Sequence, residues 1–424
     1  MNPVHIVVVV ILIIVYVWIF YQIPVIAVGV KHMRLSSRRK KEKTLHAEEQ
    51  MPTVSIIVPV KDEEKVVDRL LKALLRLDYP SEKREILIVE DGSTDRTVDI
   101  CLEYVKQYPN LIRLLHKPVS NGKPSALNYA LKHAKGEIIA FFDADNVPEP
   151  DVLKRAVTYF NEPSVAAIQG RLCSINADEN MLTKFVSYEE AAWCEAYLRG
   201  KDVLGLFVHL RGTCQFIRRD VLEKLGGFDE KALSEDMELS ARLVEAGYTI
   251  KYASDICSWQ ETPSRVGTFF QQRTRWYRGT MQVAFKYGKL MAKPSRKSLD
   301  AELTLLGPFI LIASLTSYLI AFYTTLTAFN LDFTLQFLMQ LSAIGVTLML
   351  IICGLALAYI SKPRRLTNLL WLPFIYVYWS LQAFIALYAI LLILLRRPQI
   401  WTKTRKTGSI SLHVFSDLQK DFWE

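Results

Sequence analysis

Four stretches of the 424-residue chain carry no Asp, Glu, Lys or Arg, and they restrict the possible folds more than any other feature. They cover residues 6–30, 303–331, 333–361 and 366–395. Each is long enough for a helix that crosses a hydrocarbon core of roughly 30 Å, which takes about 20 residues. A cleaved signal peptide is the alternative for the first stretch, but its apolar run is too long and its basic cluster follows it. The sequence therefore predicts an integral membrane protein.

The chain has a net charge of +9, and a cluster of basic residues follows directly after the first stretch. By the positive-inside rule, this cluster places the following polar block in the cytoplasm and the N-terminus outside the cell membrane. A nucleic-acid partner is the alternative meaning of clustered basic residues, and the adjacent span argues against it. Six cysteines without paired or metal-ligand spacing fit free thiols in a reducing compartment. The basic residues are Lys31, Arg34, Arg38, Arg39, Lys40, Lys41 and Lys43.

Between the first two stretches, short β-branched runs alternate with amphipathic helical patterns. This alternation implies a mostly parallel sheet covered by helices on both faces, with ligands bound at the carboxyl ends of the strands. Gly136 is expected to be the C′ residue of a helix. The strands are expected at 54–60, 85–91, 112–117, 137–145 and 165–170, and the helices near 66–75, 94–107 and 123–135.

Three expected strand ends carry acids, namely Glu63, Asp91 and the pair Asp143 and Asp145. Clustered carboxylates repel one another unless a cation or a hydrogen-bonded ligand joins them, so we interpret this edge as a site. Side chains two apart in an extended segment point the same way, and hard oxygen ligands suit Mg²⁺ or Mn²⁺ bound together with a diphosphate. A solvated turn is the alternative for this DxD pattern, and the preceding apolar run "IIAFF" favours the metal. Asp95 is expected to cap the next helix.

Two further segments carry polar side chains at helix starts. In "NGKPSALNYAL", Lys123 is a suitable phosphate partner, and an ordinary exposed lysine is the alternative. In "LSEDMELSARL", Ser234 is the expected N-cap and Glu235 and Asp236 follow in the first turn. The helix dipole alone would explain acids at this position. A general base that takes a proton from an incoming hydroxyl explains them equally well.

In order and spacing, "SIIVPVKDEE", "VEDGSTD", "FFDAD", "SED" and "QRTRW" resemble the motifs of inverting family 2 glycosyltransferases. More narrowly, they are similar to membrane-bound synthases related to cellulose, chitin, poly-N-acetylglucosamine and hyaluronan synthases. The resemblance covers residues 53–280 by motif and the rest by membrane architecture. It implies an α/β GT-A fold, that of the nucleotide-diphospho-sugar transferases, together with an α-helical transmembrane region. "SED" replaces the commoner "TED" and keeps the hydroxyl. "KDEE" departs from the Tyr-Asn-Glu pattern that is usual after the first strand, and this departure affects only the expected contacts with the nucleobase.

The resemblance implies a donor site for a UDP-sugar at the acidic edge. Asp145, assisted by Asp143, would hold Mg²⁺ or Mn²⁺ on the diphosphate, and Lys123 would lie near the phosphates. The segment "WTKTRKTG" (401–408) resembles one that closes over the nucleotide in several such synthases. A tail anchored by its tryptophan, with lysines on anionic headgroups, is the alternative for that segment. The implied contacts of the nucleobase are Pro59, Glu63 and Asp91.

The family pattern QxxRW corresponds to Gln272, Arg275 and Trp276. A guanidinium neutralises the charge that develops on a departing diphosphate, so Gln272 and Arg275 are assigned to the donor. The face of Trp276 suits the C–H face of a sugar at the acceptor terminus. An interfacial helix with arginine and tryptophan at headgroup depth is the alternative, and both roles are compatible.

The resemblance assigns the general base to Asp236, which would deprotonate the acceptor hydroxyl in a single displacement with inversion. Glu235 is assigned to the acceptor side, and "GTCQFIRRDVL" to the acceptor path, where Cys214 would be a wall residue. The predicted function is transfer of a sugar to the non-reducing end of a growing polysaccharide, coupled to translocation through the bilayer. The alternatives are a non-processive transferase with a lipid acceptor and an inactive nucleotide-sugar sensor. The sequence is silent on accessory subunits.

Two signals in the sequence disagree about the side of the membrane on which the C-terminal tail lies. Four full crossings place it outside, whereas the basic residues between Arg396 and Lys406 favour the inside. A segment broken at Pro373 that lies in the interface and re-enters would resolve the conflict, and we favour an inside tail. The expected division is an N-terminal transmembrane helix (1–30), a basic linker (31–52), a GT-A domain (53–262), interfacial helices (263–302), about three transmembrane helices (303–396) and a basic tail (397–424).

Overall fold

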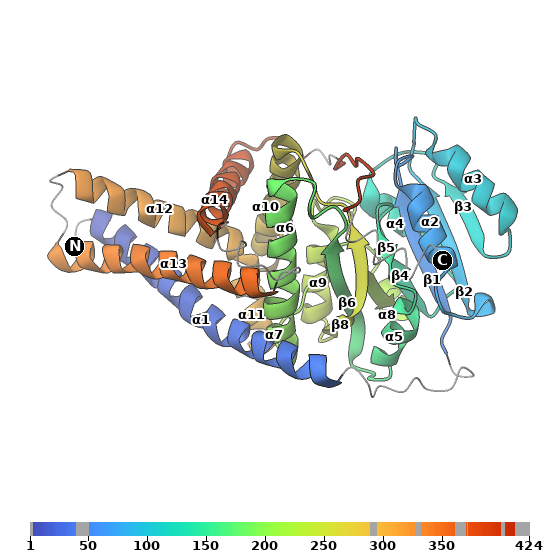
Figure 1. Ribbon diagram of the computed structural model, residues 1–424, viewed down its shortest axis with the longest axis horizontal. Coiled ribbons are helices and arrows are strands. Elements are labelled where there is room, and N and C mark those ends of the chain that lie inside the picture. Colours follow the sequence, from blue (N-terminus) through green and yellow to red (C-terminus); the bar gives the residue numbers. More distant parts are fainter. Residues whose placement is uncertain are drawn as a thin grey trace.

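The computed structural model describes residues 3–39, 51–288, 295–327, 332–360, 370, 372–399 and 403–411. A sheet-containing domain lies at one end and a group of long helices at the other (Figure 1). The tail residues 403–411 lie against the sheet domain, because the backbone N–H of Ser411 donates to the Ile175 carbonyl at 2.9 Å.

The domain is built on an eight-stranded sheet with the strand order β3-β2-β1-β4-β7-β6-β8-β5. The first four strands are parallel, as are β6 and β8, whereas β7 is antiparallel to β4 and β6, and β5 is antiparallel to β8. The mostly parallel sheet predicted from the sequence is confirmed. The strands are β1 (Val54–Val60), β2 (Arg84–Glu90), β3 (Ile112–His116), β4 (Ile138–Phe141), β5 (Val147–Pro148), β6 (Val165–Ser174), β7 (Gln215–Arg218) and β8 (Thr249–Gln260).

Helices cover both faces of the sheet because successive strand residues point to opposite sides. Ile56 and Val58 of β1 belong to a core cluster on one face, and Ile57 belongs to the cluster on the other. The covering helices are α2 (Val67–Leu75), α3 (Thr97–Gln107), α4 (Lys123–Leu131), α5 (Val152–Tyr159), α8 (Arg219–Lys224) and α9 (Glu235–Glu245).

Two local expectations need correction. Helix α4 ends at Leu131 with Lys132 as its C-cap, so Gly136 is not the C′ residue. A Cβ at Gly136 would lie 2.3 Å from the Ser55 nitrogen, so glycine is required there by close backbone approach instead. The structure places Arg96 at the N-cap of α3, and Asp95, one residue earlier, accepts the Thr97 N–H at 2.9 Å.

The sequence did not predict the helical insertion between β6 and β7, which contains α6 (Met181–Ala192), a π-helical turn (Trp193–Leu198) and α7 (Arg199–Val203). The N-terminal helix, α1 (Pro3–Arg39), crosses this insertion at very close range. A Cβ at Gly29 would lie 1.8 Å from the Ala196 carbonyl oxygen, and one at Gly200 would lie 2.0 Å from the Val25 oxygen. Glycine at both crossings therefore lets the two backbones touch. Because α1 continues to Arg39, part of the expected basic linker is helical.

Within the described residues, three helices are long and apolar enough to cross a membrane: His5–Met33, Gly307–Thr324 and Tyr376–Leu394. They lie in α1, α12 (Gly307–Leu326) and α14 (Leu372–Leu394), and α13 (Phe333–Ile360) carries a shorter apolar segment, Phe333–Leu348. Helices α1, α12 and α13 pack side by side, whereas α14 is steeply inclined to them in this view (Figure 1). Helix α14 packs along α10 (Val266–Tyr287), which is followed by α11 (Arg296–Leu305), and also against α12. Pro373 lies in the first turn of α14 and does not break it.

Candidate active site

The two acids of the DxD pattern follow β4 at the edge where the parallel strands end. The backbone N–H of Asp143 donates to Asn146 Oδ1 at 2.8 Å and also lies 3.0 Å from Thr213 Oγ1. Asn146 is completely buried, and its amide nitrogen lies 3.5 Å from the Trp259 carbonyl of β8. The loop that carries Asp143 and Asp145 is therefore fixed from two neighbouring strands.

Lys123 joins the DxD loop to the start of α9. Its Nζ lies 2.7 Å from Asp143 Oδ1 and 3.6 Å from Glu235 Oε1, and it donates to the Gly212 carbonyl at 3.0 Å. Burial alone would lower the pKa of Lys123, but Asp143 and Glu235 outweigh it and the pKa is raised. The lysine is thus a cation at neutral pH, held between the two acidic motifs.

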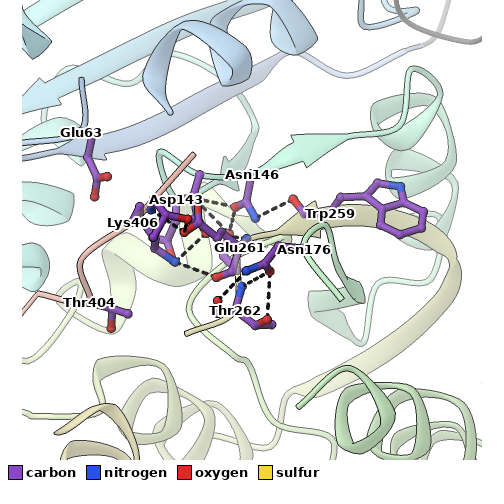
Figure 2. A network of polar contacts seen from close by, with 12 residues as sticks. Glu63, Asp143, Asn146, Asn176, Trp259, Glu261, Thr262, Thr404 and Lys406 are labelled. Carbon is purple, nitrogen blue, oxygen red and sulfur yellow. Dashed lines mark hydrogen bonds and ion pairs between the residues drawn. The ribbon is translucent and has the colours of Figure 1, made fainter. Parts of the chain in front are cut away.

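Asp145 contacts the C-terminal tail. Its Oδ2 accepts from Lys406 Nζ at 2.6 Å and from the Glu261 backbone N–H at 2.9 Å. Burial would raise the pKa of Asp145, but the Lys406 ammonium outweighs it and holds the pKa below its usual value. Figure 2 shows Lys406 beside Asp143, Glu261 and Thr262, where the sheet edge and the tail meet.

The end of β1 is tied to the same tail. Lys403 Nζ lies 3.1 Å from Glu63 Oε1 and donates to the Lys61 carbonyl at 2.5 Å. Burial raises the pKa of Glu63 to about 7, although Lys403 opposes the shift. Pro59 is the sixth residue of β1, four positions before Glu63.

Asp91 lies directly after β2, and its carboxylate is held by the β3–α4 connection. It accepts from Lys117 Nζ at 3.1 Å, from Ser120 Oγ at 3.0 Å and from the Gly122 N–H at 3.1 Å. The aspartate is only 4 % exposed. In this arrangement Asp91 holds the β3–α4 connection in place, and a contact with a nucleobase would add to these three hydrogen bonds.

The acids of "SED" lie at the N-terminus of α9, with Ser234 at the expected N-cap position. Its hydroxyl does not cap the backbone but donates to Asp236 Oδ1 at 2.9 Å, and the Met237 N–H donates to the same oxygen at 2.8 Å. Asp236 Oδ2 faces Gly212, where a Cβ would lie 3.3 Å from it. The hydroxyl shared by serine and threonine therefore orients the carboxylate, which explains why "SED" can replace "TED".

Helix α10 packs directly on this acidic turn. A Cβ at Gly279 would lie 2.7 Å from Ser234 Cβ, so glycine allows the close approach. From the same helix, Arg275 Nη1 lies 3.4 Å from the Leu233 carbonyl, and Gln272 Nε2 lies 3.4 Å from Thr404 Oγ1 of the tail. The donor-side residues of QxxRW thus lie beside the acidic turn and the tail.

The neighbouring Arg273 has a different environment. Its Nη2 lies 2.5 Å from Glu189 Oε2 of α6, and its guanidinium lies 4.7 Å from the centre of the Trp276 ring. Glu189 also accepts from Tyr378 and Gln382 of α14. Arg273 therefore joins α10 to α6 and, through Glu189, to α14. Its contacts are structural, whereas Arg275 faces the acidic turn.

Cys214 is the predicted site residue that does not face the acidic edge. Its side chain is fully buried in a core cluster of the sheet, and its Sγ lies 2.5 Å from where a Cβ would stand at Gly170. Its φ of +48° is also unusual for a residue with a side chain. The thiol therefore packs against the sheet instead of lining an open path.

Glu261 is the site residue that sequence reasoning missed. It follows β8, is 4 % exposed, and contacts both Asp145 and the tail. The sequence around it, "SWQETP", holds an acid between a strand and a proline, which is a weak signal without its partners.

Asp143 and Asp145 suit a divalent cation that takes only part of its coordination from the protein. Among the described residues no group of three or more His, Cys, Asp or Glu side chains is arranged to hold a metal ion. Two carboxylates at one edge suit Mg²⁺ or Mn²⁺, which keep several waters and complete their coordination with substrate phosphates. A cation bound here would replace the ammonium of Lys406 on Asp145.

Comparison with known proteins assigns the chain to a family. Residues 52–279 match the family model described as glycosyltransferase like family 2. A probable glycosyltransferase, YdaM of Bacillus subtilis, is 34 % identical over 68 % of this chain and 69 % of its own length. A beta-monoglucosyldiacylglycerol synthase of Nostoc is 35 % identical over 62 % of this chain and 56 % of its own length, so the match spans little more than half of that enzyme.

Two other similarities complete the comparison. The poly-beta-1,6-N-acetyl-D-glucosamine synthase of Staphylococcus epidermidis is 28 % identical over 68 % of each chain. The mannosyltransferase PcManGT of Pyrobaculum calidifontis, solved with GDP-Man and Mn²⁺, has a TM-score of 0.56 at 21 % identity, covering 92 % of this chain and all of its own. This second likeness supports the GT-A fold that the sequence predicted.

Proposed function

Because the chain belongs to the glycosyltransferase-like family 2, we propose that it transfers a sugar from a UDP-sugar to a hydroxyl acceptor with inversion. The observation that carries this proposal is the position of Lys123 between Asp143 of the DxD pair and Glu235, the neighbour of Asp236. A donor held at the DxD pair therefore lies beside a carboxylate that is positioned to deprotonate an acceptor. The experiment that tests it measures released UDP and product mass with purified protein, Mn²⁺ and a panel of UDP-sugars.

The residues of the acidic edge divide by role in this proposal. Asp143 and Asp145 would hold a divalent cation on the diphosphate, where it neutralises phosphate charge. Lys123 and Arg275 add fixed positive charge for the leaving group, since preorganised charge is most effective where charge develops. Pro59, Glu63 and Asp91 border the nucleotide, and Gln272 supports the tail through Thr404.

The chemical step is a single displacement. Asp236 Oδ2 takes the proton of the acceptor hydroxyl as that oxygen bonds to the anomeric carbon. The bond between the anomeric carbon and the β-phosphate oxygen breaks at the same time, and UDP leaves with the electron pair. No covalent sugar–protein intermediate is required, and the configuration at the anomeric carbon inverts.

We propose a growing polysaccharide as the acceptor, and a lipid acceptor is the second candidate. The relatives divide in the same way, because one synthase makes a glucosylated diacylglycerol and another a poly-N-acetylglucosamine. Trp276 follows Arg275 directly on α10, and the Arg273 guanidinium lies 4.7 Å from the centre of its ring. We propose that the other face of the indole contacts the sugar of the acceptor. Product mass distinguishes the candidates, because a polymer gives a ladder of masses and a lipid acceptor gives one added sugar per lipid.

We further propose three membrane crossings, made by α1, α12 and the 28-residue α13. Helix α14 is also long and apolar enough to cross, but we propose that it lies at the cytoplasmic interface because of the contacts at its two ends. Near its start, Tyr378 of α14 donates to Glu189 of α6, and just after its end the carbonyls of Arg397 and Pro398 accept from Arg278 of α10. Both ends of α14 therefore lie on the side of the catalytic domain. This arrangement would also put the basic tail inside, as its charge favours.

Chelation is expected to stop sugar transfer, because the diphosphate would lose the cation that Asp143 and Asp145 hold. Treatment with EDTA followed by excess Mg²⁺ or Mn²⁺ should restore UDP release, measured in a coupled assay. Mn²⁺ binding to the donor-free protein, measured by electron paramagnetic resonance, should weaken in Asp145→Asn. Full transfer in chelator would remove the proposed metal role of both acids.

The raised pKa of Glu63 predicts a pH-dependent donor affinity. Below about pH 7 its carboxyl is mostly protonated, and above it the charged form pairs with Lys403. The charged carboxylate competes with the donor diphosphate for the Lys403 ammonium, so we expect the KM for the donor to rise as pH rises from 6 to 8. Glu63→Gln should keep the low KM of pH 6 across this range, since glutamine mimics the neutral acid. An unchanged pH profile of KM in this variant would assign the dependence to another group.

A further inference from the structure

The tail segment, residues 403–411, contains no helix or strand. It runs along the acidic edge of the sheet, where the proposed donor site lies, and we call this the donor edge. Its contacts with the domain fall into two groups. Lys403 and Lys406 place ammonium groups on Glu63 and Asp145. Thr404, between them, accepts from Gln272 of α10 at 3.4 Å. The second group lies further along the tail, from Thr407 to Ser411, and involves no predicted donor-binding residue.

Glu261 makes most of this second group. Its Oε1 accepts from the Thr407 N–H at 2.5 Å and from Thr407 Oγ1 at 2.8 Å, and its Oε2 accepts from the Gly408 N–H at 2.9 Å. The Glu261 backbone carbonyl also accepts from Lys406 Nζ at 2.9 Å. A carboxylate that accepts from two successive backbone amides is a strong, directional anchor, because charge-assisted hydrogen bonds are about twice as strong as neutral ones.

The lysine contacts are less suited to hold the tail during turnover. A bound donor diphosphate would compete for both ammonium groups, and a cation would compete for Asp145. The Glu261 carboxylate accepts from the backbone and hydroxyl of the tail, which are not groups that a diphosphate or a cation would take from it. A second attachment lies beyond it, where the Asp178 N–H donates to Ser411 Oγ at 2.9 Å.

We propose that Glu261 is a positioning residue whose side chain docks the tail segment, so that Lys403 and Lys406 lie at the donor edge. The backbone N–H of Glu261 simultaneously holds Asp145. One residue thereby sets the distance between the DxD acid and the tail lysines. The docking itself is independent of the reaction, whereas its effect on donor binding rests on the proposed function.

The first test is tryptic digestion of purified protein without donor, because the tail offers cleavage sites after Lys403, Arg405 and Lys406. Glu261→Gln leaves one acceptor oxygen and turns an amide N–H₂ toward a backbone donor. We expect cleavage in the tail to be about tenfold faster than in wild type, since a lost charge-assisted hydrogen bond is worth about one decade in a docking equilibrium. Glu82→Gln, an exposed change in η2 (Ser81–Lys83), is the matched control and should cleave at the wild-type rate.

A second variant changes a residue of the tail instead of Glu261. Gly408 has a φ of +82°, and a Cβ there would lie 3.1 Å from the Lys65 carbonyl, so Gly408→Ala should undock the tail and leave the contact between Glu261 and Asp145 intact. Both variants should raise the KM for the donor about tenfold and change kcat less. Glu261→Asp, which keeps the charge, should recover part of the protection.

The outcomes separate the docking from the function. Tail cleavage at the wild-type rate in Glu261→Gln would overturn the proposal. A raised KM in Glu261→Gln with a normal KM in Gly408→Ala would also overturn it, because Glu261 would then act on Asp145 and not through the tail. If wild-type protein turns over no UDP-sugar, the proposed function fails, and the cleavage rates still decide the docking.

Discussion

Asp236→Asn is expected to lower the rate of sugar transfer by about 10²–10⁴ while the affinity for UDP stays near that of wild type. The carboxylate acts on the acceptor hydroxyl, and asparagine cannot take its proton. Asparagine retains the oxygen that accepts from Ser234 and Met237, so the turn before α9 should keep its shape. UDP release and product formation in a coupled assay measure the rate, and calorimetry measures UDP binding.

Glu245→Gln is the matched control for this substitution. It makes the same change from carboxylate to amide on the same helix, at an exposed position at the far end. It should transfer sugar at the wild-type rate. If Asp236→Asn stayed within tenfold of that rate, Asp236 would be excluded as the base, and Glu235 would be the next carboxylate to test.

The strands and the acidic edge were predictable because their signals are local. A buried parallel strand reads as a short apolar run, and the polar residues that follow it must meet at one sheet edge. Glu63, Asp91, Asp143 and Asp145 were found in this way, and the structure places all four at that edge. Each depended only on neighbours within a few positions in the sequence.

The residues that were missed depend on contacts that no local pattern encodes. Glu261 gains its role from Thr407 and Gly408, about 146 residues later, and from Asp145, 116 residues earlier. The same applies to Gly136, which resembles a helix C-cap in sequence but is required by its contact with Ser55. The helical insertion from Met181 to Val203 was missed because its acids pair with distant arginines, such as Glu189 with Arg273, which obscures its apolar face.

The two arginines of "QRTRW" on helix α10 have different environments. Arg273 contacts Glu189 and thereby connects to α14, whereas Arg275 lies toward Leu233 and the acidic turn. Residues two apart on a helix do not share a face, so Arg273 contacts α6 while Arg275 faces the acidic turn. The interfacial and the catalytic interpretations of "QRTRW" stay predictions, and they concern different arginines of the motif.

Arg275→Ala is expected to lower kcat by about 10²–10³ and to change donor KM much less, since the charge it neutralises develops mainly in the transition state. Arg275→Lys should recover only part of the rate because lysine lacks the planar fork of two N–H donors. Gln271→Ala, an exposed change on the same helix, is the control. Rates are compared per folded molecule, with folded protein quantified by size-exclusion chromatography in detergent.

Trp276→Ala should differ from Arg275→Ala in its kinetic signature. Loss of the indole face removes a contact with the acceptor, so transfer and product length should fall while hydrolysis of the donor continues. If both substitutions merely reduced membrane insertion and left turnover per folded molecule unchanged, the two residues would anchor α10 at the interface. The charge on the departing UDP would then be neutralised without α10, by Lys123 and the tail lysines, whose ammonium groups already lie on Asp143, Asp145 and Glu63.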